Sequence, residues 1–551
     1  MSTTPQTQRS RLTPRAAGWV WALPTAFAVV VAVAVALAES AALVGWRPLT
    51  SQLGAACFLA ALVVVGVVAT FLLARDERPI HGWWLGCIPA LALVGYAVGA
   101  RFLSEGHRAE WFIGGDNVRH LLYATEIERA GNLSYASQVY PRAWHTVVAT
   151  LWSATGGQQD GAGFRSLVDV MSTATWLLPG VVSLAMASAA TALGSRLGLT
   201  DSRAAWAGLV AAVPVLLPPF LGDYQARGFQ TSYLGAVLLA LALRLALVRP
   251  TAARLVGAGA SVVVCAHTWQ LLLPPVGLAL LVVTAALVRS RGRSAWALAG
   301  VVWAATGAAA WPALFAVSAN VGVGHAAVSE VVAPAPRVLL VVGLMVTIGL
   351  AWQRRRDVRL LHAAAVVALP ALTAWGLTIY LGTSLSDYYP SKLLWQSALL
   401  ALAPLAVAAC LLHQRLGRGL AARLGRTAIV TAGVVLVASG LLAPVAAFVG
   451  AWSSVHGGLL LRAVSAPAAG RAQVVWLGDT ADDTYARVLL DFYGTGTTLV
   501  RTPQAPQGIA GDCELLRASA APAVLTDRPA PEVLRRYACV PGVGVVPVPP
   551  R

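Results

Sequence analysis

Charged residues are scarce in this chain of 551 residues, since Asp, Glu, Lys and Arg together make up only 11%. Soluble globular proteins carry roughly a quarter of their residues as charged ones. Together with 58% hydrophobic residues, this scarcity excludes a soluble globular protein. We therefore expect a mainly α-helical membrane protein that crosses the bilayer many times.

Lysine is nearly absent. Of the 40 basic residues, one is Lys392 and the other 39 are arginine, and the formal net charge is +17. The arginines fall in short clusters between apolar runs, which is typical of cytoplasmic loops in membrane proteins rather than of a nucleic-acid-binding surface. The charge thus indicates topology, and we expect membrane lipids but no nucleic acid as partners.

Cysteine is also rare, with six in the chain. Four of them, Cys57, Cys87, Cys265 and Cys410, lie in apolar runs, where a thiol usually behaves as a small hydrophobic group. The other two, Cys513 and Cys539, lie in the C-terminal region. A disulfide makes sense only for this last pair.

Long apolar runs dominate the rest of the chain. About 20 apolar residues suffice to cross the hydrocarbon core as a helix. By this measure the sequence predicts about thirteen spans: Trp19–Ala38, Gln52–Ala74, Trp83–Phe102, Ser166–Gly194, Ala204–Leu221, Thr231–Val248, Leu255–His267, Leu271–Val288, Ser294–Ala316, Arg337–Trp352, Leu360–Leu381, Leu393–Leu412 and Thr427–Gly450.

The arginine clusters predict the orientation. Arg9, Arg11 and Arg15 place the N-terminus in the cytoplasm, and with thirteen spans the later clusters also fall inside. We therefore expect a plasma-membrane protein with a cytoplasmic tail over 1–18 and a transmembrane domain over 19–450. Its large first extracytoplasmic loop would cover 103–165.

The composition becomes more polar after the last predicted span. The sequence predicts strands at 473–477, 497–501 and 523–526 and a helix at 482–492. This order indicates a small α/β domain. With the orientation above, the C-terminal region 451–551 would be extracytoplasmic.

The most polar part of the predicted outer face is the segment from Gly114 to His145. An imperfect apolar stripe follows Asp116, and the run Pro141–Thr155 is short for a span. We expect both to form helices that lie in the membrane interface.

Asp116 is the main candidate for catalysis. It follows two glycines at a predicted loop-to-helix junction, where a carboxylate can cap the helix or act as a general base. His120 follows four residues later, so that the two side chains share a helix face and could hold a divalent cation. His145 and His267 could add ligands or contact a phosphate, although an interfacial histidine is more often a hydrogen-bonded structural residue.

A second candidate segment is Asp387–Lys392. A lysine ammonium is a compact charge suited to phosphate, and we place it in a short outer loop. Tyr388 and Tyr389 are candidate neighbours, or aromatic residues of the membrane interface. Arg227, in another predicted outer loop, is a further possible phosphate contact.

These residues resemble the GT-C superfamily of integral-membrane glycosyltransferases, in particular its actinobacterial, arabinofuranosyltransferase-like branch. The resemblance rests on Asp116 with His120 in a large outer loop, on the Tyr-Pro-x-x-x-His stretch that ends at His145, and on Tyr388-Tyr389-x-x-Lys392. It also rests on the many spans and the outer C-terminal region.

The resemblance implies a polyprenyl-phosphate sugar as the donor and a glycan or glycolipid of the cell envelope as the acceptor. Asp116 would deprotonate the acceptor hydroxyl, and Lys392, with Arg227 or a histidine, would stabilise the departing phosphate. Many members of the superfamily carry paired acids in the outer loop, whereas this chain has Asp116 alone, so that a metal requirement is not implied.

Two other functions fit the same composition. A transporter or flippase of lipid-linked sugars would place ionisable residues near the middle of its spans. A non-catalytic protein of the cell envelope would use its outer surface to bind glycan or a partner.

Overall fold

The structure is a computed structural model. It describes residues 13–78, 80–112, 117–134, 142–157, 161–217, 220–221, 229–320 and 336–416. Toward the C-terminus it describes 423, 427, 430–436, 438–439, 442, 474–477, 513–514, 516–517, 523–526 and 529–547.

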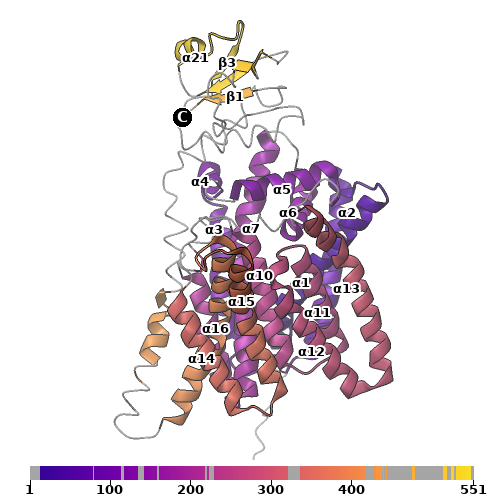
Figure 1. Cartoon of the computed structure of the whole chain (residues 1–551), viewed down its shortest axis with the longest axis vertical. Coiled ribbons are helices and arrows are strands. Elements are labelled where there is room, and N and C mark those ends of the chain that lie inside the picture. The colour runs from indigo at the N-terminus through magenta and orange to yellow at the C-terminus, as the bar shows by residue number, and fades with distance from the viewer. Residues whose placement is uncertain are drawn as a thin grey trace, which may run out of the picture.

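The described chain is mainly helical (Figure 1). The α-helices up to residue 416 are α1 (Thr13–Leu43), α2 (Gln52–Ala74), α3 (Ile88–Ala100), α4 (Glu105–Glu110), α5 (Asn117–Ala130), α6 (Ala143–Ala154), α7 (Gly161–Arg196), α8 (Asp201–Ala212), α10 (Gln230–Leu247), α11 (Ala252–Ala266), α12 (Leu273–Arg291), α13 (Arg293–Asn320), α14 (Arg337–Gln353), α15 (Val358–Leu381) and α16 (Tyr388–Arg415). Short 3-10 helices, η1 (Pro48–Thr50), η2 (Trp83–Cys87), η3 (Val213–Leu216) and η4 (Gln270–Leu272), join some of them.

Within the described part of the chain, nine helices are long and apolar enough to cross a membrane. They correspond to nine of the thirteen predicted segments, while the shorter helices α8, α11 and α14 overlap three others. The last predicted segment, Thr427–Gly450, lies partly outside the described residues. The multi-pass helical architecture is confirmed, and the count of thirteen stays a prediction.

One end of the bundle is held together by ion pairs, and we call it the arginine end. Glu77, just after α2, contacts Arg244 of α10 and Arg254 of α11 at 2.6 and 3.0 Å. Arg196, at the end of α7, forms two hydrogen bonds of 2.7 and 2.8 Å with Asp357, just before α15. Arginines that are far apart in the sequence therefore meet at one end of the bundle.

Glu77 and its two arginines are almost fully buried, with side chains 4–7% exposed. Burial alone would raise the pKa of the Glu77 carboxyl, but the guanidiniums of Arg244 and Arg254 outweigh burial and lower this pKa below its ordinary value. Glu77 is therefore ionised, and its charge is balanced inside the protein.

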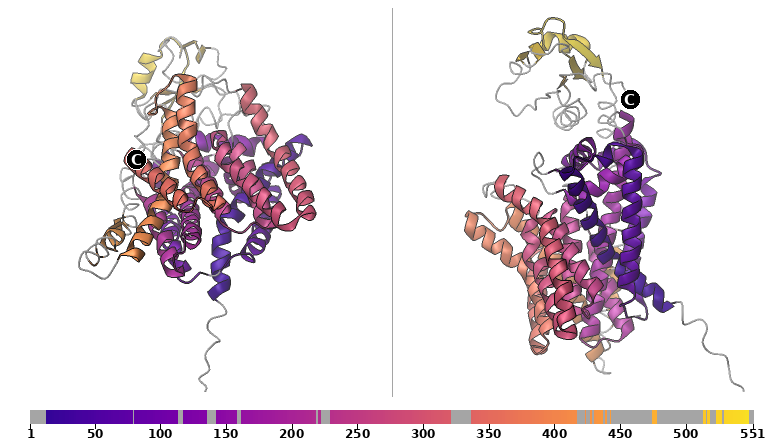
Figure 2. Two further views of the ribbon diagram at one scale, coloured as in Figure 1. Left: turned by 60° about the horizontal axis from the view of Figure 1, so that its bottom comes forward. Right: turned by 90° about the vertical axis from the view of Figure 1, so that its right-hand side faces the viewer.

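The opposite end, which we call the histidine end, carries α4, α5 and α6 (Figure 1). The backbone N–H of Leu133, after α5, donates to the carbonyl of Ala38 near the end of α1 at 3.2 Å, and the N–H of Ala143 at the start of α6 donates to His267 at 2.8 Å. Both predicted interfacial helices are confirmed as helices, α5 and α6. Figure 2 shows the start of α1 at one end and the C-terminal strands beyond the other.

The core lies around α10, in which all 18 residues are buried. Helices α7, α11, α12, α15 and α16 pack against it. Close crossings use small residues: a Cβ added to Gly257 would overlap Thr25 of α1, and one added to Gly343 would overlap Ala401 of α16. In lipid the hydrophobic effect does not bring helices together, so that close van der Waals packing of this kind stabilises the bundle instead.

Lys392 was predicted in a loop, and this is wrong. Helix α16 begins at Tyr388 and runs for 28 residues, so that Lys392 lies on its second turn. Asp387 precedes the helix, and Pro390 occupies its first turn, where the missing N–H needs no partner. The predicted span began at Leu393, where the apolar run begins. The helix itself begins five residues earlier, with polar residues that hydropathy does not assign to a span.

Toward the C-terminus the structure describes three parallel strands, β1 (Val474–Leu477), β2 (Ala523–Thr526) and β3 (Gly544–Pro547), in the order β1-β2-β3. The predicted strands at 473–477 and 523–526 are confirmed, whereas the predicted helix at 482–492 and strand at 497–501 lie outside the described residues. Helix α21 (Ala530–Arg536) precedes β3.

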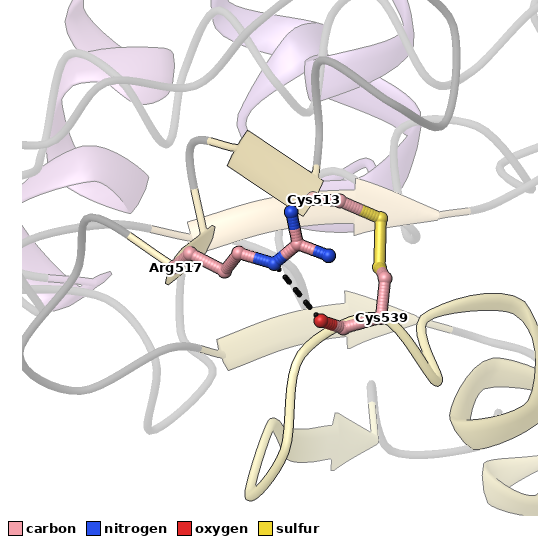
Figure 3. The surroundings of a disulfide bond; sticks show 3 residues. All are labelled: Cys513, Arg517 and Cys539. Carbon is pink, nitrogen blue, oxygen red and sulfur yellow. Dashed lines mark hydrogen bonds between the residues drawn. A yellow bond between two sulfur atoms is a disulfide. The ribbon is translucent and has the colours of Figure 1, made fainter.

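Cys513 and Cys539 form a disulfide with 6.0 Å between their Cα atoms (Figure 3). The Arg517 Nε–H donates to the carbonyl of Cys539 at 3.0 Å. The disulfide lies in a small apolar cluster with Leu516, Val524, Tyr537 and neighbouring residues. The one pair for which a disulfide made sense from sequence is therefore bonded.

The arginine end gives a test of stability. Glu77→Gln should lower the free energy of unfolding by about 3–5 kcal/mol, because it leaves two buried guanidiniums without a counter-charge. Asp201→Asn is the matched control, since Asp201 and Arg78 form an exposed pair at 3.7 Å and such pairs contribute less than about 1 kcal/mol. Thermal unfolding of the detergent-purified protein measures both, and equal stability of the two variants would contradict the expectation.

Candidate functional site

The two helices α5 and α6 bring two predicted site residues into contact. His120 Nδ1 and His145 Nε2 lie 2.8 Å apart, and the rings stack with centroids at 5.0 Å. Both side chains are buried, at 2% and 0% exposure. One ring nitrogen must donate a hydrogen and the other must accept it, so that the two imidazoles hold each other in defined tautomers.

Tyr123, one turn after His120, packs beside this histidine pair. Its ring meets the His145 ring edge-on with 5.2 Å between the ring centroids, and the Arg142 guanidinium lies over the Tyr123 ring at 4.6 Å from its centroid. Arg142 also forms an ion pair with Glu126. His120, Tyr123 and Glu126 follow one another at a spacing of three residues, so that these three side chains lie on one face of α5.

Arg142 and His120 affect the protonation of His145. Complete burial lowers the pKa of His145 well below its ordinary value, and the nearby charges of His120 and Arg142 lower it further. His145 is therefore a neutral imidazole near neutral pH. A neutral imidazole offers one donor and one acceptor to a polar ligand or to a neighbour.

Helix α6 is fixed to the bundle on its other side. Trp144 Nε1–H donates to Gln230 Oε1 at 3.1 Å, and Gln230 Nε2–H donates to Thr175 Oγ1 of α7 at 3.2 Å. Gln230 is the first residue of the buried α10. The position of His145, next to Trp144, is thus set by the two most buried long helices.

Lys392 lies close to the same start of α10. Its Nζ is 3.4 Å from the ring centroid of Phe229 and 3.7 Å from that of Tyr388, and the side chain is 6% exposed. These two rings meet edge-to-face at 87°, and Tyr389 packs on Tyr388 at 5.0 Å. The ammonium is thus held by cation–π contacts in a nearly dry place.

The predicted residues therefore fall into two contact groups. His120 and His145 form one, and Lys392 with Tyr388 and Tyr389 forms the other. The neighbouring residues Trp144, Gln230 and Phe229 connect the groups in space. His267 joins the first group through its backbone, whereas its side chain points to α1 and α13. Asp116 and Arg227 lie outside the described residues.

Sequence reasoning missed several members of these groups. Arg142 and Trp144 lie inside the Tyr-Pro-x-x-x-His stretch that ends at His145, so that their position in the sequence could have identified them. The spacing of three residues from His120 could have identified Tyr123 and Glu126. For Phe229 no local pattern gives a signal, because its partner Lys392 is 163 positions away (392 − 229).

The predicted cation site concerns Asp116 and His120, of which only His120 is among the described residues. Among them no three His, Cys, Asp or Glu side chains gather where they could hold a metal ion. A divalent cation held by Asp116 and His120 stays a prediction, since Asp116 is not among these residues. Comparison with models of known protein families and with curated proteins finds no match to this chain.

The state of His145 predicts a pH dependence of stability. The unfolded chain binds a proton at this histidine below about pH 6.5, whereas the folded protein does not. The unfolded state then holds more protons, so that stability falls as the pH falls below this value. His145→Gln should reduce that slope by up to about 1.4 kcal/mol per pH unit, because an amide does not titrate.

Unfolding temperatures at several pH values between about 5 and 7.5 would measure this slope. The matched control is His81→Gln, which makes the same substitution at an exposed histidine. An unchanged slope in His145→Gln would show that His145 takes up a proton in the folded protein.

Proposed function

We propose that the chain is an integral-membrane glycosyltransferase of the GT-C type. It transfers a sugar from a polyprenyl-phosphate donor to a glycan or glycolipid at the extracytoplasmic face of the plasma membrane. The observation that carries the proposal is Lys392: a lysine buried in a corner of aromatic rings at the histidine end, one helix turn from the start of an apolar helix.

The chemistry needs a cation at this place. In the transfer, the acceptor oxygen forms a bond to the anomeric carbon, the bond between that carbon and the phosphate oxygen breaks, and its electron pair leaves with the phosphate. The Lys392 ammonium stabilises the growing phosphate charge, and in surroundings of low polarity each such contact counts for more than in water.

The acceptor must also lose a proton. Asp116 takes the proton of the attacking hydroxyl, in the role of general base. It comes four residues before His120 in the chain, and the histidine pair with Tyr123 and Arg142 provides neutral and cationic donors for sugar hydroxyls. Attack opposite to the departing phosphate inverts the anomeric centre.

The same proposal includes the orientation. The arginine end faces the cytoplasm, in line with the positive-inside rule, and the histidine end faces outward. The C-terminal strands form an extracytoplasmic α/β domain, where the disulfide between Cys513 and Cys539 suits an oxidising compartment.

A transporter fits the placement of charges less well. In the described residues of the nine candidate spans, charged side chains lie near helix ends, and the one furthest inside is Asp169, eight residues after the first residue of α7. Asp169 is paired with Arg101 and Arg108, at 3.1 and 2.6 Å. A proton- or ion-coupled transporter would be expected to carry such groups at mid-span.

The first test concerns Asp116. Asp116→Asn should lower transfer by about 10²–10⁴-fold, because the general base is lost, while the protein stays folded in the membrane. Mass spectrometry of lipid extracts from a deletion strain carrying either form measures the product and the accumulated donor. Glu105→Gln is the matched control, a half-exposed acid of the same predicted loop that pairs with Arg165.

The control should restore the product to the wild-type level. Normal product with Asp116→Asn would refute the assigned role. If the deletion strain lacks no glycolipid or glycan at all, the glycosyltransferase proposal fails as a whole.

The second test concerns Lys392. Lys392→Gln should lower the rate of transfer by about 10²–10³-fold with a smaller change in KM, because the lost contact strengthens in the transition state. Lys392→Arg should recover only part of the rate although it keeps the charge, since a planar guanidinium cannot lie over both rings at once. Full activity of Lys392→Gln in a membrane assay would remove Lys392 from the mechanism.

A further inference from the structure

The short connection between α1 and α2 contacts the C-terminal end of α5, and none of the site residues discussed above belongs to it. The Arg47 Nε–H donates to the carbonyl oxygen of Ala130 at 2.8 Å, and its Nη2–H donates to that of Arg129. Two residues further on, the backbone N–H of Leu49 donates to the carbonyl oxygen of Gly131 at 3.1 Å. One connection thus supplies the donors for three successive carbonyls.

The end of α5 needs donors from outside the helix. The last four C=O groups of an α-helix have no partner within it, so that they depend on other groups. The backbone N–H of Gly131, whose φ is +76°, donates to the carbonyl oxygens of Ile127 and Glu128 at 2.8 and 2.9 Å. The three carbonyls that follow receive their hydrogen bonds from the connection, two of them from the guanidinium of Arg47.

The connection approaches the end of α5 closely. A Cβ added to Gly131 would lie 2.6 Å from the Cβ of Arg47, and the positive φ is one that glycine adopts without strain. The Asn132 Nδ2–H donates back to the carbonyl oxygen of Trp46 at 2.9 Å. Hydrogen bonds therefore run in both directions between α5 and this connection, and we call the segment Trp46–Thr50 the clasp.

The clasp also holds the end of α6. The Ser153 Oγ–H donates to the carbonyl oxygen of Leu49 at 2.6 Å. Ser153 is buried and is the residue before the last one of α6. The clasp therefore joins the C-terminal ends of the two helices that carry the histidine pair, while the histidines themselves lie toward the other ends of these helices.

A displacement at the clasp would reach His120. Glu126 forms an ion pair with Arg142, directly before α6, so that α5 can turn about this pair when the clasp is lost. With a rise of about 1.5 Å per residue, Ala130 lies about 6 Å from Glu126 on one side and His120 about 9 Å on the other. A shift of about 1 Å at Ala130 then moves His120 by about 1.5 Å, which breaks its hydrogen bond of 2.8 Å to the other histidine.

The partners of Arg47 also account for an arginine at this place. At the same end of the bundle, Arg108 and Arg165 pair with the carboxylates of Asp169 and Glu105. Arg47 instead meets the C-terminus of a helix, where the aligned peptide dipoles give a partial negative charge. A guanidinium there both supplies hydrogen-bond donors and lowers the electrostatic energy of the helix end.

We propose that Arg47 is a positioning residue for the His120–His145 pair and acts through the C-terminal end of α5. Its guanidinium does not touch the histidines in this proposal. It fixes the tilt of the helix that carries His120. Only the transfer measurement below rests on the proposed glycosyltransferase function.

The test follows the hydrogen bond between the two imidazoles. In protein labelled with ¹⁵N at its nine histidines, nuclear magnetic resonance detects a scalar coupling between two ring nitrogens that share a hydrogen bond. We expect the wild type to show this coupling and His145→Gln to lose it, which assigns the signal to the pair. Arg47→Ala should lose the coupling as well, because α5 is then free to tilt.

Three further variants test the route through the clasp. Gly131→Ala keeps the arginine but pushes the clasp away from α5, and it should also lose the coupling. Arg47→Lys keeps the charge and a donor for a carbonyl, and it should recover part of the coupling. Arg291→Ala is the matched control, since Arg291 is an exposed arginine in the last turn of α12, and it should keep the coupling of the wild type.

A coupling of wild-type strength in Arg47→Ala would overturn the proposal, and so would its absence from the wild type. If Arg47→Ala does not fold, Gly131→Ala decides in the same way. Loss of the coupling in Arg291→Ala would also contradict a specific role of Arg47.

These measurements need no transferase activity, so that they separate this proposal from the proposed function. Where transfer can be assayed, Arg47→Ala should lower its rate by up to about 10²-fold, as a misplacement of about 1 Å can do, and Arg47→Lys should recover part of the rate. A wild type without transferase activity, in which Arg47→Ala still removes the coupling, would refute the proposed function and support the positioning role.

Discussion

The cost of burying charge is the constraint on which this structure depends. A bundle whose central helix is buried along all of its 18 residues leaves few places for an ion, and the chain meets this limit by placing its charged side chains near helix ends. Where an ion is nevertheless enclosed, as at Glu77, two guanidiniums lie against it. The pairing fixes the ends of α2 and α10 and the start of α11 relative to one another.

The two ends of the bundle meet this constraint in different ways. At the arginine end, acids are paired with fully charged guanidiniums, which leaves little capacity to exchange protons. At the histidine end, Arg142 also forms an ion pair with Glu126, but other buried groups pair through a hydrogen bond between imidazoles or through ring contacts, as His120 with His145 and Lys392 with Phe229 do. Neutral imidazoles and an ammonium over aromatic rings offer hydrogen-bond donors and acceptors to a polar or anionic ligand, which is why we place the chemistry there.

Much of the architecture could be predicted from the sequence, because hydropathy is a local property. The runs that became the nine long helices were visible. The segments that became α11 and α12 could also have formed one long helix, and the positive-inside rule favoured two because Arg254 and Arg289 bracket the pair. The strands at 474–477 and 523–526 followed from short β-branched runs between polar residues.

The candidate site was harder to predict, because its contacts join distant parts of the chain. No periodicity connects Glu39 with His267, whose Nδ1 lies 3.6 Å from its carboxylate, and the predicted first span ended at Ala38, directly before Glu39. The start of α16 was missed for the opposite reason, since Asp387, Tyr388 and Lys392 have the polar composition of a loop. In both places the tertiary environment, rather than local composition, decides where the side chain lies.

Lys392 shows how such an environment can select a residue type. The chain uses arginine at every other basic position, so that composition alone would favour arginine here. Phe229 and Tyr388, however, meet at 87° and form a corner. A compact ammonium can lie over both ring faces at once, as the distances of 3.4 and 3.7 Å show, whereas a planar guanidinium can stack on only one. The single lysine therefore has a geometric reason, and the same compactness suits a charge that must face a phosphate.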